Sequence, residues 1–182
     1  MNEKEKNRKG KFLSLILRHQ PETIDLSLDA EGWAVVNELL TQLAAHHHPL
    51  TRNELEELVL TNDKQRYSFS ADGEKIRANQ GHSLKTVELG LEPVEPPAIL
   101  YHGSASRFMD LILVEGLKAQ SRQHVHLSKD IETATKVGAR HGRPVIFVVD
   151  AQQMWTDAYL FYCSANKVWL TEKVPAKYLK IV

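Results

Sequence analysis

Three prolines within the six residues of Glu92-Pro93-Val94-Glu95-Pro96-Pro97 limit what this chain can fold into more than any other feature. Proline fixes φ and has no backbone N–H, so such a run forms an extended, semi-rigid connector rather than a helix or an inner strand. The run lies close to the middle of 182 residues. The sequence therefore predicts two lobes, residues 1–92 and 98–182, joined by the linker 93–97.

The first lobe has the pattern of helices followed by a hairpin. Apolar residues at helical spacing predict helices over 9–19, 37–45 and from Thr51 onward. Asn37 is a candidate N-cap for the second helix, and Thr51-Arg-Asn-Glu54 matches a capping box for the third. A short extended piece is expected at 33–36. Two alternating runs, 66–70 and 74–78, flank Asp72-Gly73, which is a strong hairpin signal. Helices that end in a hairpin are typical of a winged helix.

The second lobe mixes strands and helices. Strands are predicted over 98–101 (running into His102-Gly103-Ser104), 125–127, 144–150, 158–162 and 168–171. Helices are predicted over 106–114 and 131–139, the latter capped by Ser128 or Asp130. This order favours an α+β fold over a doubly wound sheet.

The composition excludes several classes of protein. Lys+Arg and Asp+Glu are both 23, which argues against coating nucleic acid by charge alone but leaves room for a local basic cleft. The single cysteine, Cys163, lies between aromatic residues and is interpreted as a core residue of a protein from a reducing compartment. No signal-peptide core or bilayer-length apolar run is present, so a cytoplasmic location, away from membranes, is expected. His46-His47-His48 is typical of a surface turn, no metal-ligand spacing is present, and nothing suggests more than a monomer.

Four polar clusters are candidates for chemistry: Arg18-His19, Asp63–Arg66, Arg77–Ser83 and Arg122–Ser128. The planar fork of arginine grips phosphate with two parallel hydrogen bonds, and histidine moves protons near neutral pH. Each cluster also has a structural explanation, because helix C-termini attract basic residues and Arg66 and Arg77 can be solvated hairpin positions. His126 can likewise be a hydrogen-bonded core residue and Arg122 a loop charge. Neither a G-x-G-x-x-G fingerprint nor a Walker A loop is present.

Five segments in order carry a family resemblance. They are Leu13-Ser-Leu-Ile-Leu-Arg-His-Gln-Pro21, Asp29-Ala-Glu-Gly-Trp33, Arg77-Ala-Asn-Gln-Gly-His-Ser83, Tyr101-His-Gly-Ser104 and Arg122-Gln-His-Val-His-Leu-Ser128. With them the chain resembles the RNA 2′-phosphotransferases, the family of the tRNA 2′-phosphotransferases and the bacterial KptA-like proteins. The match spans nearly the whole chain, from Lys11 to Thr171.

The resemblance implies an N-terminal winged-helix lobe that holds an RNA phosphate and a C-terminal ADP-ribosyltransferase-like lobe that holds NAD as co-substrate. It implies that an internal RNA 2′-phosphate, as at a tRNA splice junction, attacks C1″ of NAD and expels nicotinamide. The ribose 2″-hydroxyl then attacks that phosphate. The products are RNA with a free 2′-hydroxyl and ADP-ribose 1″,2″-cyclic phosphate.

The motif match also implies roles for individual residues. Arg18 and Arg66 are expected to clamp the 2′-phosphate, His19 to act in the second step, and Arg122 to bridge NAD and the phosphate. Guanidinium groups from both halves are thus expected to converge on one nucleophile. The residues expected to bind NAD are His102, Gly103, Ser104, His126 and Ser128. Those expected to contact RNA are Arg77, His82 and Ser83.

Three positions need comment. ADP-ribosylating toxins carry a late glutamate at the position where this chain has Val168. The absence of that glutamate fits a nucleophile that is already anionic. The family usually has threonine where Ser104 stands, and a hydroxyl is retained. The family usually has glycine where Lys167 stands. If that position needs a positive φ, lysine strains the turn by roughly 1 kcal/mol.

Two alternatives remain open from the sequence. The same scaffold can ADP-ribosylate terminal phosphates of RNA or DNA without the second step. A winged helix can also be a non-catalytic nucleic-acid binding module, although that hypothesis gives no role to the segment 122–128.

Overall fold

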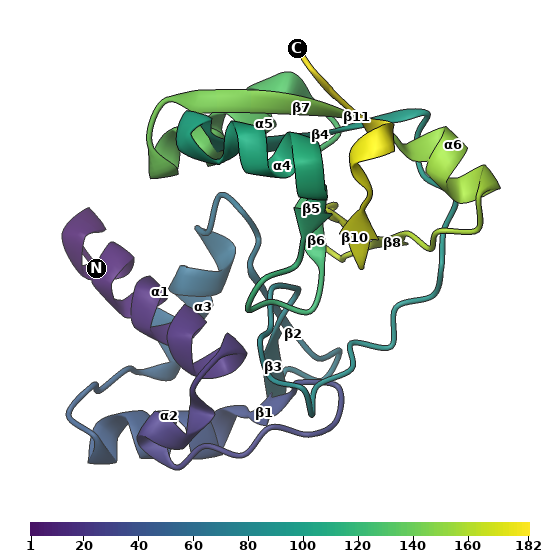
Figure 1. Cartoon of the computed structure of the whole chain (residues 1–182). Helices are drawn as coiled ribbons and strands as arrows, with labels where there is room; N and C mark the ends of the chain where they lie inside the picture. Colours follow the sequence, from purple (N-terminus) through teal and green to yellow (C-terminus); the bar gives the residue numbers. More distant parts are fainter. The chain divides into compact units, whose positions relative to one another are not determined.

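The computed structural model describes residues 1–182 and divides into two compact units, Met1–Gly90 and Leu91–Val182. Figure 1 shows the first unit in purple and blue and the second in teal, green and yellow. Both units combine helices with antiparallel strands, which agrees with the predicted α+β class. The proline-rich segment belongs to the second unit, where the Val94 N–H donates to the Phe161 carbonyl at 2.8 Å.

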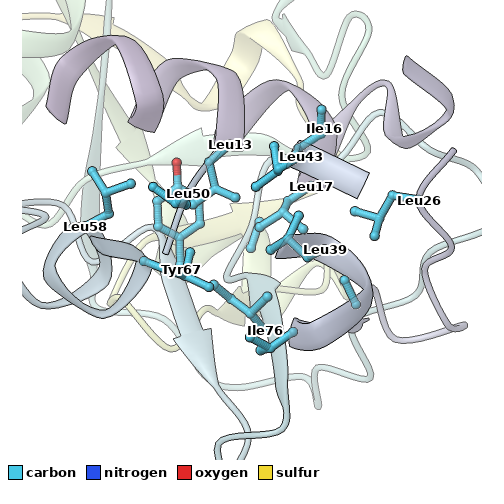
Figure 2. Close-up of a cluster of buried hydrophobic side chains, with 14 of the residues drawn as sticks. Leu13, Ile16, Leu17, Leu26, Leu39, Leu43, Leu50, Leu58, Tyr67 and Ile76 are labelled. Atoms are coloured by element: carbon cyan, nitrogen blue, oxygen red, sulfur yellow. The ribbon is translucent and has the colours of Figure 1, made fainter. Parts of the chain in front are cut away.

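The first unit packs three helices against a small sheet. Its elements are α1 (Glu3–Arg18), η1 (Pro21–Ile24), β1 (Ala34–Val35), α2 (Val36–Ala45), α3 (Arg52–Leu60), β2 (Tyr67–Phe69) and β3 (Lys75–Ala78). The strands pair antiparallel in the order β1-β3-β2. Figure 2 shows leucine and isoleucine side chains of the helices meeting Tyr67 and Ile76 of the hairpin in one core.

Helix starts in this unit test the sequence predictions. The capping box is confirmed, since Thr51 and Glu54 each accept the other's backbone N–H. The predicted start of the first helix at Lys9 is wrong, because Asn2 accepts the Glu5 N–H and caps a helix that begins at Glu3. The charged first turns lack apolar periodicity but consist largely of good helix formers. The predicted Asn37 cap is also wrong, because the N-cap is Val35.

The second unit combines three small antiparallel sheets with helices. Its elements are β4 (Ile99–Ala105), η2 (Ser106–Phe108), α4 (Met109–Glu115), β5 (Leu117–Lys118), β6 (Val125–Leu127), α5 (Ile131–Gly138), η3 (Ala139–His141), β7 (Pro144–Asp150), α6 (Ala151–Thr156), β8 (Tyr162–Cys163), β9 (Trp169–Thr171), β10 (Lys173–Val174), η4 (Ala176–Tyr178) and β11 (Leu179–Ile181). The sheets have the orders β11-β7-β4, β6-β9-β8 and β10-β5. An isolated bridge between Tyr101 and Ser128 joins the first two sheets.

The predicted helices and most predicted strands of the second unit are confirmed, whereas α6, β5, β10 and β11 were not predicted. The predicted strand 158–162 is wrong except at its last residue. Helix α6 precedes it, started by Asp150 accepting the Gln153 N–H, and Ala158 then adopts a φ of 68°. The cap of α5 is Asp130, the second of the two candidates, which accepts the Thr133 N–H at 2.6 Å.

Candidate functional site

Arg18 and Arg66 line the same cavity of the first unit. This cavity, of about 630 Å³, lies along one face of α1 and the loop before β2 and also receives Ser14, Lys11 and Lys64. Arg18 is the last residue of α1 and is only 9% exposed, so the helix core holds its stem rigidly. The backbone and guanidinium N–H groups of Arg66 both donate to Asn62 Oδ1, at 3.2 and 3.4 Å. Two aimed guanidinium groups in one hollow suit an anion.

Tyr67 stands behind this cavity. Its hydroxyl donates to the Gly10 carbonyl at 2.8 Å and accepts from the Ser14 hydroxyl. Burial raises the pKa of Tyr67, while the Ser14 hydrogen bond and the positive charges of Arg18 and Arg66 act against that rise. The tyrosine therefore stays neutral and fixes the α1 face that carries Ser14.

The C-terminal end of α1 is tied to Ser83 at two points, through His19 and Arg18. His19 Nδ1 lies 2.9 Å from Ser83 Oγ, and the Ser83 N–H donates to the Arg18 carbonyl at 3.1 Å. The loop after β3 is thereby attached to the C-terminal end of α1. This explains how residues 64 positions apart come together.

His82 lies inside the unit rather than on its surface. His82 is 1% exposed, so its ring packs inside the first unit, next to Gly32. Its contact with RNA stays a prediction. Burial first, and then the charges of Arg18, His19 and Arg77, lower the pKa of His82 from 6.5 to about 4. A neutral imidazole can pack beside these cations without adding to their repulsion.

Arg77 is not a freely solvated hairpin residue. Its guanidinium lies 4.4 Å from the centre of the Trp33 ring and donates to the Glu31 carbonyl at 3.4 Å. Trp33 is held in turn by its N–H bond to Asp29 Oδ1, at 2.9 Å. The segment Asp29–Trp33 is thus a platform for Arg77. Sequence reasoning missed this partner, because the pairing of β1 with β3, which brings the two residues close together, appears only in the folded unit.

Two histidines and Arg122 form the polar cluster of the second unit. Arg122 Nη1 lies 3.1 Å from His126 Nδ1, and since arginine can only donate, His126 Nδ1 accepts and its proton sits on Nε2. His102 Nδ1 donates to the His126 carbonyl at 3.0 Å, which leaves His102 Nε2 as the acceptor. Burial lowers the pKa of His102, so this ring is neutral. Ser128 lies alongside through its bridge to Tyr101.

Gly103 and Ser104 have different surroundings. A Cβ at Gly103 would lie 1.7 Å from the Ala134 carbonyl of α5, so this position requires glycine for packing, whatever it binds. His102 and Ser104 alternate with Gly103 along β4 and therefore point to the opposite face of the strand. Arg122 is exposed in the loop before β6.

Each unit thus gathers its own predicted residues: Arg18, His19, Arg66, Arg77, His82 and Ser83 in the first, and His102, Ser104, Arg122, His126 and Ser128 in the second. No group of three or more His, Cys, Asp or Glu side chains is placed to hold a metal ion. None of the helices has the length and apolar character needed to cross a membrane. His46–His48 form a turn, and Cys163 is a half-buried free thiol.

Comparison with known proteins places the chain among named relatives. The sequence profile of the family described as "RNA 2'-phosphotransferase, Tpt1 / KptA family" matches residues 4–173. A protein of Hahella chejuensis named "Probable RNA 2'-phosphotransferase" is 55% identical over 174 residues, covering 96% of this chain and 93% of the relative. A protein of the same name from Agrobacterium fabrum is 53% identical, and the match covers 94% of this chain and 92% of the relative. Another from Flavobacterium johnsoniae is 51% identical, and the match covers 99% of this chain and 98% of the relative.

Proposed function

Because the chain belongs to the RNA 2′-phosphotransferase family, we propose that it removes an internal 2′-phosphate from RNA, of the type left at a tRNA splice junction, with NAD as acceptor. The observation that carries this proposal is the shared cavity of Arg18 and Arg66. The first unit is its phosphate-binding, winged-helix lobe, and the second is its NAD-binding, ADP-ribosyltransferase-like lobe. A chain with helices, a three-stranded antiparallel sheet and a terminal hairpin in its first unit is compatible with that assignment.

The first step needs a clamp more than a base. A phosphate monoester already carries about −1.5 to −2 charge near neutral pH, so it attacks without being deprotonated. Arg18 and Arg66 hold its oxygens, and Asn62 keeps the Arg66 guanidinium aimed. The 2′-phosphate oxygen bonds to C1″ of the nicotinamide ribose, and nicotinamide leaves as a neutral molecule.

The residues of the second unit suit the other substrate. Arg122 offers positive charge for the pyrophosphate or the reacting phosphate, and His126 orients it through the 3.1 Å hydrogen bond. His102 presents an acceptor nitrogen because its other nitrogen donates to the His126 carbonyl. Ser104 and Ser128 add hydroxyl groups on neighbouring strands.

The second step frees the RNA. The ribose 2″-hydroxyl attacks the phosphorus, and the bond from phosphorus to the RNA 2′-oxygen breaks. His19 acts here as the proton-transfer group, held by Ser83 in a fixed orientation. The 2′-oxygen takes up a proton to give the 2′-hydroxyl, and the cyclic phosphate departs with ADP-ribose.

The direct test is to incubate the protein with NAD and a defined 2′-phosphorylated oligonucleotide. We expect nicotinamide, 2′-hydroxyl RNA and ADP-ribose 1″,2″-cyclic phosphate. The His19→Ala variant is expected to accumulate RNA that carries ADP-ribose on its 2′-phosphate. The proposal is refuted by the absence of nicotinamide release. A stable ADP-ribosyl cap on terminal phosphates, with no reaction at 2′-phosphates, would favour the alternative activity.

A further inference from the structure

The first unit carries a second cavity that the phosphate-binding residues do not use. It has a volume of about 610 Å³ and lies between α1 and the connection from α2 to α3. Its floor is apolar and includes Leu13, Leu43 and Leu50, which Figure 2 labels in the core. Phe12, Leu15 and Pro49 extend this apolar lining to the opening.

Aromatic rings stand at the edge of this cavity. The rings of Phe12 and His48 are stacked, with centroids 3.9 Å apart and an angle of 22° between planes. Phe12 is half-buried and His48 is exposed, so the imidazole covers the phenyl ring and keeps an outer face toward solvent. Flat, exposed ring faces of this kind receive nucleobases by stacking, in a manner that tolerates any base.

The charge around the opening is positive. Lys9 is compensated by Glu54 at 2.8 Å and Glu5 at 3.6 Å. Arg8 and Lys11 are exposed and form no ion pair. The uncompensated charge therefore attracts an anion, and with the apolar floor and the rings the combination fits a nucleotide.

The two cavities adjoin along α1. Lys11 lines both of them, while Arg18 and Arg66 occur only in the first and Phe12 and His48 only in the second. A strand whose 2′-phosphate sits at Arg18 and Arg66 can therefore pass Lys11 and reach the rings.

We propose that the cavity at Phe12 and His48 is a subsite for a nucleotide of the RNA substrate flanking the 2′-phosphorylated one, with the base on the His48 ring and its phosphate at Arg8 and Lys11. This inference rests on the proposed function, since it takes the 2′-phosphate to be bound at Arg18 and Arg66. It predicts that the enzyme distinguishes RNA by the presence of a flanking base and not by its identity.

The test compares a 2′-phosphorylated hexanucleotide with a 2′-phosphorylated mononucleotide, which has no flanking base, at saturating NAD. His48→Ala removes the platform without touching the core, Phe12→Leu keeps the apolar floor, and Arg8→Gln removes one cation. Lys4→Gln is the matched control, since Lys4 is exposed on the same helix and lines neither cavity. We expect His48→Ala to raise the KM of the hexanucleotide about tenfold, the order of one lost base stack, and to leave the KM of the mononucleotide unchanged. Arg8→Gln should weaken binding of the hexanucleotide and lower the salt dependence of that binding by about one counterion.

Abasic RNA identifies the contact as stacking. Removing the flanking base should raise the KM of the wild type about as much as His48→Ala does. In the His48→Ala variant, the same removal should raise the KM little further. The inference is overturned if the losses of affinity caused by His48→Ala and by the abasic RNA are additive. It is also overturned if His48→Ala changes the KM of both substrates equally or of neither. It is also overturned if adenosine monophosphate binds the cavity while the hexanucleotide is unaffected by His48→Ala, because the occupant would then be a free nucleotide.

Failure of the proposed function is recognised separately. If that function is wrong, the wild type releases no nicotinamide with either substrate. Binding of fluorescently labelled 2′-phosphorylated and abasic hexanucleotides, measured without NAD in the wild type and the four variants, then still decides whether the subsite exists.

Discussion

Replacing Lys167 by glycine is expected to stabilise this protein. Lys167 has a φ of 63° in the turn that joins β8 to β9, within the left-handed region that favours glycine. Its backbone cannot relax toward negative φ, because the Lys167 N–H donates to the Ser164 carbonyl and the Ser164 N–H to the Val168 carbonyl, both at 2.9 Å. Ser164 Oγ also accepts the Val168 N–H at 3.1 Å. The turn thus imposes a conformation that a side chain with a Cβ adopts at a cost.

The size of the effect follows from two opposing terms. A non-glycine residue in the left-handed region costs roughly 1–2 kcal/mol. Glycine also makes the unfolded chain more flexible, which lowers the stability of the folded state by about 0.4–1 kcal/mol. The net stabilisation of Lys167→Gly is therefore about 0.5–1 kcal/mol. The side chain is exposed, so no buried contact is lost with it.

Urea unfolding with a spectroscopic readout measures this difference. Lys167→Ala is the matched control, since it removes the same charge and stem but keeps the Cβ. We expect the glycine variant to unfold at higher urea than the wild type and the alanine variant to show no gain. Equal stabilisation by both substitutions would refute the argument from φ and point to the charge instead. A glycine variant less stable than the wild type would refute it as well.

Three further outcomes are expected. The folded protein binds fewer protons at His82 than the unfolded chain between pH 6.5 and about 4, so stability should fall as the pH drops through that window, by up to about 3 kcal/mol from this residue. In His82→Gln, urea unfolding at several pH values should show a shallower fall, and an unchanged slope would contradict the assignment. Gly103→Ala should lower the free energy of unfolding by about 3 kcal/mol or more, because the added carbon would lie 1.7 Å from a backbone oxygen of α5 that cannot move aside. A stable Gly103→Ala protein that has lost only NAD binding would show that the glycine serves the ligand alone. Arg18→Lys should reduce kcat/KM about 100-fold, since a lysine cannot form the two parallel hydrogen bonds of a guanidinium. Near-normal turnover would remove Arg18 from the site.

The hydrogen bonds of the site show what motif spacing leaves out. The sequence singled out Arg77 and His82 as RNA contacts, and the structure adds that Arg77 stacks on Trp33 and that His82 is buried near the charges of Arg18, His19 and Arg77. Gly103 was expected at NAD, and its packing against Ala134 appears only once α5 lies across β4. Each of these depends on a partner far along the chain.

Local signals determined much of the fold directly. The capping box at Thr51 and Glu54, the hairpin about Asp72-Gly73 and the apolar strand 144–150 all appear as predicted. Each rests on backbone hydrogen bonds or side-chain patterns within a few residues, which the sequence contains in full. The order of the motifs likewise identified the family. The tertiary structure alone decided that Arg18 and Arg66 line one cavity and that Ser83 holds His19. Burial and side-chain pairing of this kind arise only when segments far apart in the sequence pack together, and the periodicity of the sequence does not record them.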